Sequence, residues 1–153
     1  MKVYLDTCSI HRPLDSKNQI RILLEADAVL GIISLCDAGQ IDLVSSEALL
    51  YEARRNPNPV RKQHALAVQK KANIVININD IIEQRARLFV EDGIKPLDAS
   101  HLASAEAAEV AYLCTCDDRF LKRAQKRSVL SVKVVSPVTL IEQLDLLCLK
   151  PNH

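Results

Sequence analysis

Short apolar segments typical of β-strands alternate with longer segments of helical periodicity along nearly the whole chain, and this alternation most constrains the fold. The expected strands are residues 2–5, 41–44, 73–78, 111–115 and 132–135. The expected helices are residues 20–36, 48–55, 60–71, 80–91, 95–109, a short basic segment after Asp117, and 137–147. Several strands are continuous apolar runs, which is the pattern of parallel strands buried on both faces. The sequence therefore predicts an α/β fold, a three-layer α/β/α sandwich around a mostly parallel five-stranded sheet.

The segment between the first strand and the first helix is expected to be irregular. Residues 7–16 are largely polar and include a proline, a composition typical of loops. We interpret this segment as an exit loop.

The composition indicates one globular domain, residues 1–153, because 48% of the residues are hydrophobic and no linker or repeat interrupts the chain. A formal net charge of +1 gives no global attraction to nucleic acid or anionic membranes. Aromatic residues make up only 3% of the chain, too few for a base-stacking platform. No apolar stretch approaches the roughly 20 residues that span a bilayer, and no signal peptide precedes the first strand. A cytoplasmic location without membrane association is expected.

The cysteines favour a reduced, structural role. Their number is odd, and they lack the paired spacing of zinc sites, so neither a disulfide framework nor a zinc centre is expected. We interpret them as small buried apolar residues: Cys8, Cys36, Cys114, Cys116 and Cys148.

Four acidic residues lie at or near the expected carboxyl ends of strands, where ligands collect in parallel sheets: Asp6, Glu52, Asp98 and Asp117. Taken singly, each has an ordinary interpretation as a turn residue, an exposed helix residue or a helix N-cap. Gathered in one cleft they would repel one another unless a cation neutralised them. Oxygen ligands without a matching His or Cys set favour Mg²⁺ or Mn²⁺ over zinc.

Three stretches of the sequence are similar to one known family. They are VYLDTCSI, LVSSEALLYEARRN and KPLDASHLASAEAAEVAYLCTCDDRFLKRA, which begin at residue 3 and end at residue 124. In these stretches the chain resembles the PIN-domain nucleases, a family that includes the toxins of VapBC toxin–antitoxin systems. Two departures weaken the toxin assignment: Cys116 replaces a commonly small polar residue, and HRPLDSKNQIR is unlike the better-known toxins.

The resemblance implies roles for individual residues. The metal-binding acids would be Asp6, Glu52, Asp98 and Asp117, with Glu47 as the alternative to Glu52 and Asp118 as the alternative to Asp117. Hydroxyl groups of Thr115 and of Ser9 or Thr7 would orient ligands or water. His101 follows Asp98 by one helical turn, and we interpret it as a surface or capping residue rather than a cleft residue that holds a phosphate.

The function implied by the resemblance is an Mg²⁺- or Mn²⁺-dependent endoribonuclease that hydrolyses RNA phosphodiester bonds. Its RNA contacts would include Arg119, Lys122 and Arg123, which share one helix face. As the toxin of a type II toxin–antitoxin system it would bind an antitoxin protein, and members of this family commonly form homodimers. The alternative is a non-catalytic PIN-like module that binds RNA or protein.

Overall fold

The fold is built around a five-stranded sheet whose strand pairs are all parallel. The computed structural model describes residues 1–127 and 130–148. In chain order the strands are β1 (Lys2–Leu5), β2 (Asp42–Ser46), β3 (Ile74–Ile76), β4 (Tyr112–Cys114) and β5 (Lys133–Val135), and their spatial order is β3-β2-β1-β4-β5. All five expected strands are present, and the prediction of an α/β fold around a parallel sheet is confirmed.

Helices connect the strands, as parallel pairing requires. They are α1 (Thr7–His11), the 3₁₀ helix η1 (Arg12–Leu14), α2 (Ile20–Asp37), α3 (Glu47–Arg55), α4 (Pro59–Gln69), α5 (Asp80–Glu91), α6 (Pro96–Ala107), α7 (Asp118–Gln125) and α8 (Pro137–Cys148). The bounds of α5 agree with the sequence-based prediction, and the bounds predicted for α2, α3, α4, α6 and α8 agree with the structure or differ from it by one or two residues. Whether the fold has three layers depends on which face of the sheet each of these helices covers.

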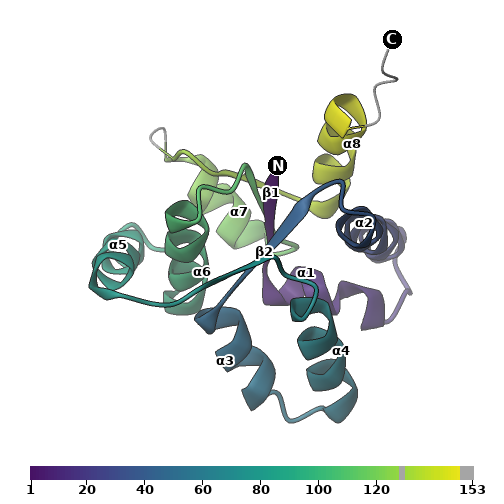
Figure 1. Ribbon diagram of the computed structural model, residues 1–153, viewed down its shortest axis with the longest axis horizontal. Helices are drawn as coiled ribbons and strands as arrows, with labels where there is room; N and C mark the ends of the chain where they lie inside the picture. The colour runs from purple at the N-terminus through teal and green to yellow at the C-terminus, as the bar shows by residue number, and fades with distance from the viewer. Residues whose placement is uncertain (128–129, 149–153) are drawn as a thin grey trace.

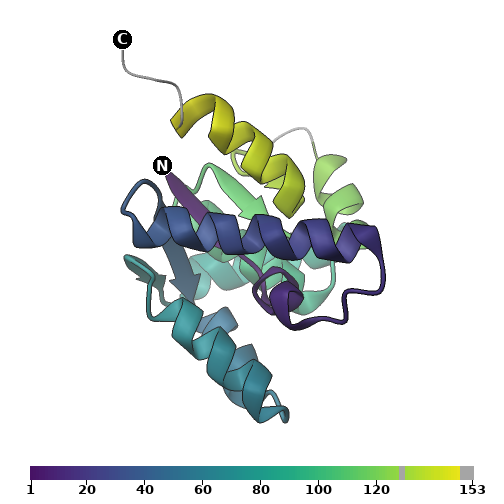
Figure 2. The same ribbon diagram turned by 90° about the vertical axis from the view of Figure 1, so that its right-hand side faces the viewer.

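Two groups of helices cover opposite faces of the sheet (Figure 1). Helices α2 and α8 pack together on one face, while α5 and α6 pack together on the other, next to α7. Figure 2 shows α2 crossing the sheet with α8 beside it, and α3 and α4 extending below as a helical hairpin. The change of face comes between β3 and β4, where the chain returns across the sheet, because parallel crossovers keep a right-handed sense.

The sheet core is apolar and fully enclosed. Val3, Tyr4 and Leu5 of β1 have no exposed surface, since β1 is the central strand. Leu102 of α6 and Leu140 of α8 pack from the two faces. Within residues 1–127 and 130–148, no helix combines the length and apolar character needed to cross a bilayer.

The segment after β1 differs from its expected loop conformation. Residues 7–14 form α1 and η1, because Asp6 caps the first turn and Ile10 is buried against the core. Pro13 lies in the first turn of η1, where its missing N–H breaks no helical hydrogen bond. The prediction of a loop was therefore wrong over these residues.

The expectation that the cysteines are buried holds for two of the four described side chains. Cys114 and Cys116 are buried, Cys8 and Cys36 are half-buried, and all four are free thiols. The side chain of Cys148 lies outside the part of the chain that the structure describes.

Candidate active site

Asp6 is held rigidly at the carboxyl end of β1. Its side chain is the N-cap of α1, and Oδ1 accepts hydrogen bonds from the backbone N–H of Ser9 at 3.0 Å and from the Cys8 thiol at 3.1 Å. Only 2% of the residue is exposed, and this burial raises the pKa of its carboxyl above the ordinary value. A fixed, desolvated carboxylate of this kind has a strong need for a positive partner.

The charges of the other three predicted acids all affect the ionisation of Asp98. This residue lies in the first turn of α6, with Lys95 rather than Asp98 at the N-cap position, so the N-cap interpretation was wrong. The pKa of Asp98 is raised to about 6, first by burial, then by the charge of Asp6 and in smaller measure by the charges of Asp117 and Glu52. The fold thus brings Asp6, Glu52 and Asp117 close enough to Asp98 for their charges to disfavour its ionised form.

Asp117 is the N-cap of α7 at the carboxyl end of β4. Its Oδ1 accepts hydrogen bonds from the backbone N–H groups of Arg119 at 2.9 Å and Phe120 at 3.2 Å. The Thr115 hydroxyl in turn accepts a hydrogen bond from the backbone N–H of Asp117 at 3.1 Å. Thr115 therefore orients the turn that carries Asp117, consistent with an orienting role.

The two alternative acids lie elsewhere. Asp118 is exposed and makes a two-pronged ion pair with Arg21, at 2.8 and 2.6 Å. Glu47 is the exposed first residue of α3 and lines a shallow hollow together with Tyr51 and Arg54. Neither is among the main causes of the raised pKa of Asp98.

Glu52 is half-buried on α3 and bound to a histidine from α6. Its Oε1 accepts a hydrogen bond from His101 Nε2. Burial alone would raise the pKa of Glu52, but the hydrogen bond from His101, with weaker contributions from the surrounding groups, lowers the pKa overall.

His101 is 1% exposed, so its interpretation as a surface or capping residue was wrong. Its Nδ1 lies 2.7 Å from the Tyr4 hydroxyl, which is 2.6 Å from Ser46 Oγ. The sequence carried one signal for His101, its spacing of one helical turn from Asp98. It carried none for the contact with Tyr4, which depends on the packing of α6 over β1.

Ser9 has a different environment from the one expected of a residue that orients water. Its hydroxyl is fully buried and donates to the backbone carbonyl of Cys114 at 3.0 Å, which ties α1 to β4. Its backbone N–H, not its hydroxyl, contacts Asp6. The alternative hydroxyl residue, Thr7, is the first residue of α1.

Basic residues border the pair Asp98 and Asp117. A small hollow contains both acids and is also lined by Ile94, Lys95, Arg119, Phe120 and Arg123. The guanidinium of Arg123 donates to the carbonyl of Gly93, the residue with positive φ that follows α5. Lys122 does not line this hollow, and Lys95 is a cation that the sequence analysis did not single out.

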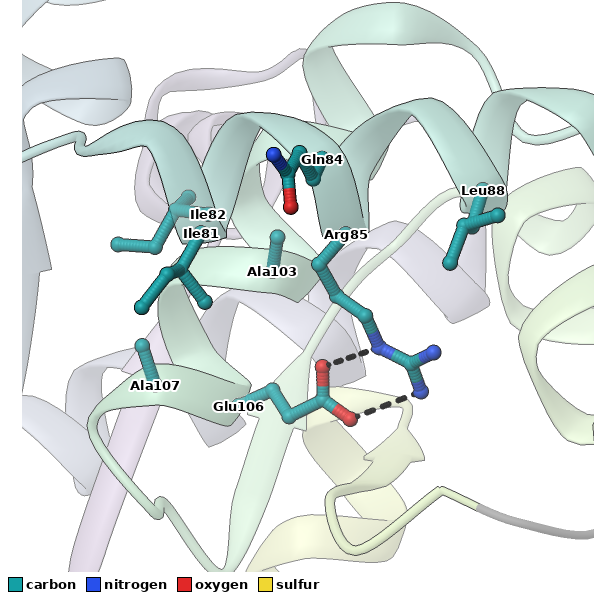
Figure 3. A pocket seen from close by; sticks show the side chains of 8 residues that line it. All are labelled: Ile81, Ile82, Gln84, Arg85, Leu88, Ala103, Glu106 and Ala107. Atoms are coloured by element: carbon teal, nitrogen blue, oxygen red, sulfur yellow. Dashed lines mark hydrogen bonds and ion pairs between the residues drawn. The ribbon is translucent and has the colours of Figure 1, made fainter.

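A larger hollow lies away from these acids. It is a mainly apolar groove between α5 and α6, lined by Ile81, Leu88 and their neighbours (Figure 3). Arg85 and Glu106 form a two-pronged ion pair across it, at 2.8 and 3.0 Å. None of the predicted site residues lines this groove.

The donor set of the acidic cluster suits a hard divalent cation. Among the described residues, no three His, Cys, Asp or Glu side chains are grouped closely enough to enclose a metal ion by themselves. Mg²⁺ is commonly held by one or two carboxylates together with waters and substrate phosphates, so it does not need a complete protein cage. Asp98 and the three acids that repel it fit that requirement, since a cation relieves the repulsion that helps to raise the pKa of Asp98.

The sequence profile of the PIN domain matches residues 3–126. The chain belongs to the PIN-domain family. Two solved structures share this PIN fold. PAE2754 from Pyrobaculum aerophilum has 17% sequence identity and a TM-score of 0.54, over 95% of this chain and 99% of its own. A chain of VapBC2 from Rickettsia felis, in a complex bound to a promoter DNA fragment, has 14% identity and a TM-score of 0.55, over 89% of this chain and 98% of its own.

At these identities the likeness to the solved structures concerns the fold alone. Among curated proteins, no relative matches the chain. Residues 3–126 include each of the four acids of the candidate site, the last of them at the start of α7. The PIN match thus covers the whole acidic cluster.

Proposed function

We propose that this PIN-domain protein is a metal-dependent endoribonuclease that hydrolyses RNA phosphodiester bonds at the acidic cluster. The observation that carries the proposal is the pKa of Asp98, which burial and the charges of Asp6, Asp117 and Glu52 raise to about 6. Natural folds keep such repelling carboxylates together mainly where a cation or a proton uses them. Membership of the PIN-domain family supports nuclease chemistry over proton chemistry.

The four acids would hold Mg²⁺ or Mn²⁺, with Asp6 and Asp98 as the most rigidly placed ligands. When bound, the metal would lower the pKa of water and stabilise charge on the phosphate oxygens. The chain's own groups prepare this site: the Ser9 N–H fixes one oxygen of Asp6, and Thr115 fixes the turn before α7. Asp117 and Glu52 complete the ligand set, directly or through water.

The RNA backbone would bind beside the acids. Arg119 and Arg123 line the same hollow as Asp98 and Asp117, and Lys95 adds a third positive charge. Bound there, a phosphate next to the scissile one would be neutralised by these cations, which would compensate for the small net charge of the whole chain. Lys122, which does not line the hollow, is a weaker candidate for this contact.

The decisive experiment is cleavage of a mixed-sequence RNA pool by the purified protein. We expect Mg²⁺-dependent cleavage that EDTA abolishes and that Asp98→Asn eliminates, while the matched control Glu47→Gln cleaves normally. Intact RNA in every arm, together with salt-dependent RNA binding, would instead support the alternative, a non-catalytic RNA-binding module. Activity in Asp98→Asn would contradict the proposed metal site.

A role as a toxin is the finer part of the proposal. The likeness of the fold to a chain of VapBC2 supports this role. A toxin would be covered at the acidic cluster by a segment of an antitoxin, and it would pair with a second copy of this chain. A small reading frame directly upstream, whose product suppresses RNA cleavage when added to the protein, would support the toxin role. An unregulated enzyme without such a neighbour would be a free-standing nuclease.

A further inference from the structure

A continuous chain of hydrogen bonds runs from the start of α3 through the core to Glu52. The Leu49 N–H lies 3.2 Å from Ser46 Oγ, which lies 2.6 Å from the Tyr4 hydroxyl. The Tyr4 hydroxyl lies 2.7 Å from His101 Nδ1, and His101 Nε2 contacts Glu52 Oε1. This chain of hydrogen bonds thus joins β1, the end of β2, α3 and α6.

Solvent has almost no access to the middle of this chain of hydrogen bonds. Tyr4 and Ser46 have no exposed surface, and His101 is 1% exposed. Buried polar groups need hydrogen-bond partners within the protein, because water cannot replace a missing one. The direction of each hydrogen bond is therefore fixed by its neighbours in the chain.

The backbone amide sets that direction. Since the Leu49 N–H can only donate, Ser46 Oγ accepts from it, and the Ser46 hydrogen then points to the Tyr4 oxygen. Tyr4 in turn donates to Nδ1 of His101, which leaves the ring hydrogen on Nε2 to be donated to Glu52. In the reverse direction the Ser46 hydrogen would have no acceptor among the described residues. Only the Nε2–H tautomer satisfies every group.

We propose that His101 is a positioning residue for the metal site: Ser46 and Tyr4 fix it as the Nε2–H tautomer, and its N–H holds Glu52 Oε1 in one orientation. The inference rests on the proposed function, since it takes Glu52 as one of the metal ligands. It goes further by assigning the orientation of that ligand to three buried residues that touch neither metal nor substrate.

Glu52 needs such a support more than the other three acids do. Asp6 and Asp117 are fixed by backbone N–H groups at helix N-caps, and Asp98 has a short side chain in the first turn of a helix. Glu52 lies well inside α3, on a longer side chain that must lose more rotamer freedom to take up a fixed position. Neighbours that hold a ligand in place commonly change metal affinity 10- to 100-fold.

The test measures the affinity of the protein for Mn²⁺ alone by isothermal titration calorimetry, without RNA. Tyr4→Phe removes only the hydroxyl in the middle of the chain of hydrogen bonds, and we expect this variant to bind Mn²⁺ more weakly by roughly 10-fold or more. Tyr112→Phe is the matched control, because Tyr112 is a buried strand tyrosine whose hydroxyl makes no hydrogen bond within the described chain. It should bind Mn²⁺ as the unmodified protein does.

A second pair of variants tests His101 itself. His101→Phe should lose affinity, while His101→Gln, whose side-chain amide can donate at nearly the same place as Nε2, should recover most of it. A role confined to packing would give the opposite order, since Phe fills the ring volume better than Gln. Thermal unfolding confirms that each variant is folded before its affinity is interpreted.

Nitrogen-15 NMR of the unmodified protein examines the tautomer without any substitution. We expect the His101 ring to carry its hydrogen on Nε2 and none on Nδ1, and the Tyr4→Phe variant to lose this fixed pattern. A hydrogen on Nδ1 would overturn the proposal even if every variant failed to fold.

Glu52→Gln separates the two levels of the argument. If Glu52→Gln weakens Mn²⁺ binding but Tyr4→Phe and His101→Phe do not, the positioning role is wrong and the metal site stands. If Glu52→Gln binds Mn²⁺ normally, Glu52 is not a ligand, and both the inference and that part of the proposed function fail.

Discussion

The carboxylate of Asp6 raises the pKa of Asp98, although the two residues belong to distant parts of the chain. Burial has the larger effect, and together with the neighbouring charges it brings the pKa of Asp98 to about 6. The repulsion arises because β1 and α6 meet at the carboxyl edge of the sheet, where both acids are held in fixed positions.

Without metal, neutralising Asp98 should stabilise the protein at neutral pH. The unfolded chain releases this proton near the ordinary pKa of 3.8, whereas the folded protein keeps it up to about pH 6. The folded state therefore binds more protons between these values, so the contribution of Asp98 to stability falls as the pH rises through this window. We expect Asp98→Asn to be more stable than the unmodified protein above pH 6, with the difference disappearing towards pH 3.8, by urea denaturation in EDTA.

Asp118→Asn provides the control for this measurement. Arg21 lowers the pKa of the Asp118 carboxyl, so its ionised form is favoured in the folded state and neutralisation should give no stabilisation. A gain of stability in Asp118→Asn equal to that of Asp98→Asn would mean that the effect comes from net charge and not from the acidic cluster.

Asp117 should have two separable roles, in stability and in cleavage. Asp117→Ala removes the N-cap of α7 and should cost about 1 kcal/mol in the free energy of unfolding, whereas Asp117→Asn keeps a capping oxygen and should cost much less. Both should abolish Mg²⁺-dependent RNA cleavage, because both remove the charge. Denaturation and cleavage assays on the same preparations distinguish the roles, and full cleavage by Asp117→Asn would exclude it as a ligand.

The sequence was sufficient for the framework of the fold because most of its strands and helices are specified locally. The apolar run of β1 and the periodicity of α5 are visible in a short window, and the expected start of the last helix at residue 137 agrees with the start of α8. Helix α1 was not predicted, since its polar segment becomes helical only when Asp6 caps it and Ile10 packs against the core. Its stability depends on tertiary contacts more than on its own composition.

The acids of the candidate site were accessible from the sequence for the same local reason, because most of them lie directly at strand ends or helix starts. The environment of Glu52 was not accessible from the sequence. His101 and Tyr4 are an ordinary helix residue and an ordinary strand residue until α6 packs over β1, which places the ring between the hydroxyl and the carboxylate. Long-range polar contacts of this kind leave no periodic pattern in one sequence.

Arg12 should be important for stability because it neutralises a buried acid. Glu25 of α2 is 3% exposed, and its Oε1 lies 3.3 Å from Arg12 Nε and 3.5 Å from Arg21 Nε. Arg12→Met leaves Glu25 with only the more exposed partner, and we expect a loss of about 3 kcal/mol in the free energy of unfolding. Arg21→Met, at a half-exposed position, should cost less than about 1 kcal/mol by urea denaturation.

The combined replacement of both charges examines the cause. If Arg12 acts by neutralising Glu25, the double variant Arg12→Met/Glu25→Leu should regain most of the stability lost in Arg12→Met, since no buried charge remains. A double variant as unstable as Arg12→Met would show that Arg12 acts through packing or through its ion pair with Asp15, which is 3.0 Å long.

The basic residues near the acids predict a specific salt dependence of RNA binding. Each phosphate contact to single-stranded RNA contributes about −0.7 to the slope of log affinity against log salt concentration. In the cleavage-deficient Asp98→Asn background, Arg119→Gln should reduce this slope by about 0.7, because Arg119 lines the hollow that contains Asp117. Lys122→Gln, on the same helix but outside the hollow, should leave the slope unchanged in fluorescence anisotropy titrations with a mixed-sequence oligoribonucleotide. If Arg119→Gln and Lys122→Gln gave the same salt dependence, the RNA would not follow this hollow. If only Lys122→Gln reduced the slope, the RNA would lie on another face of α7.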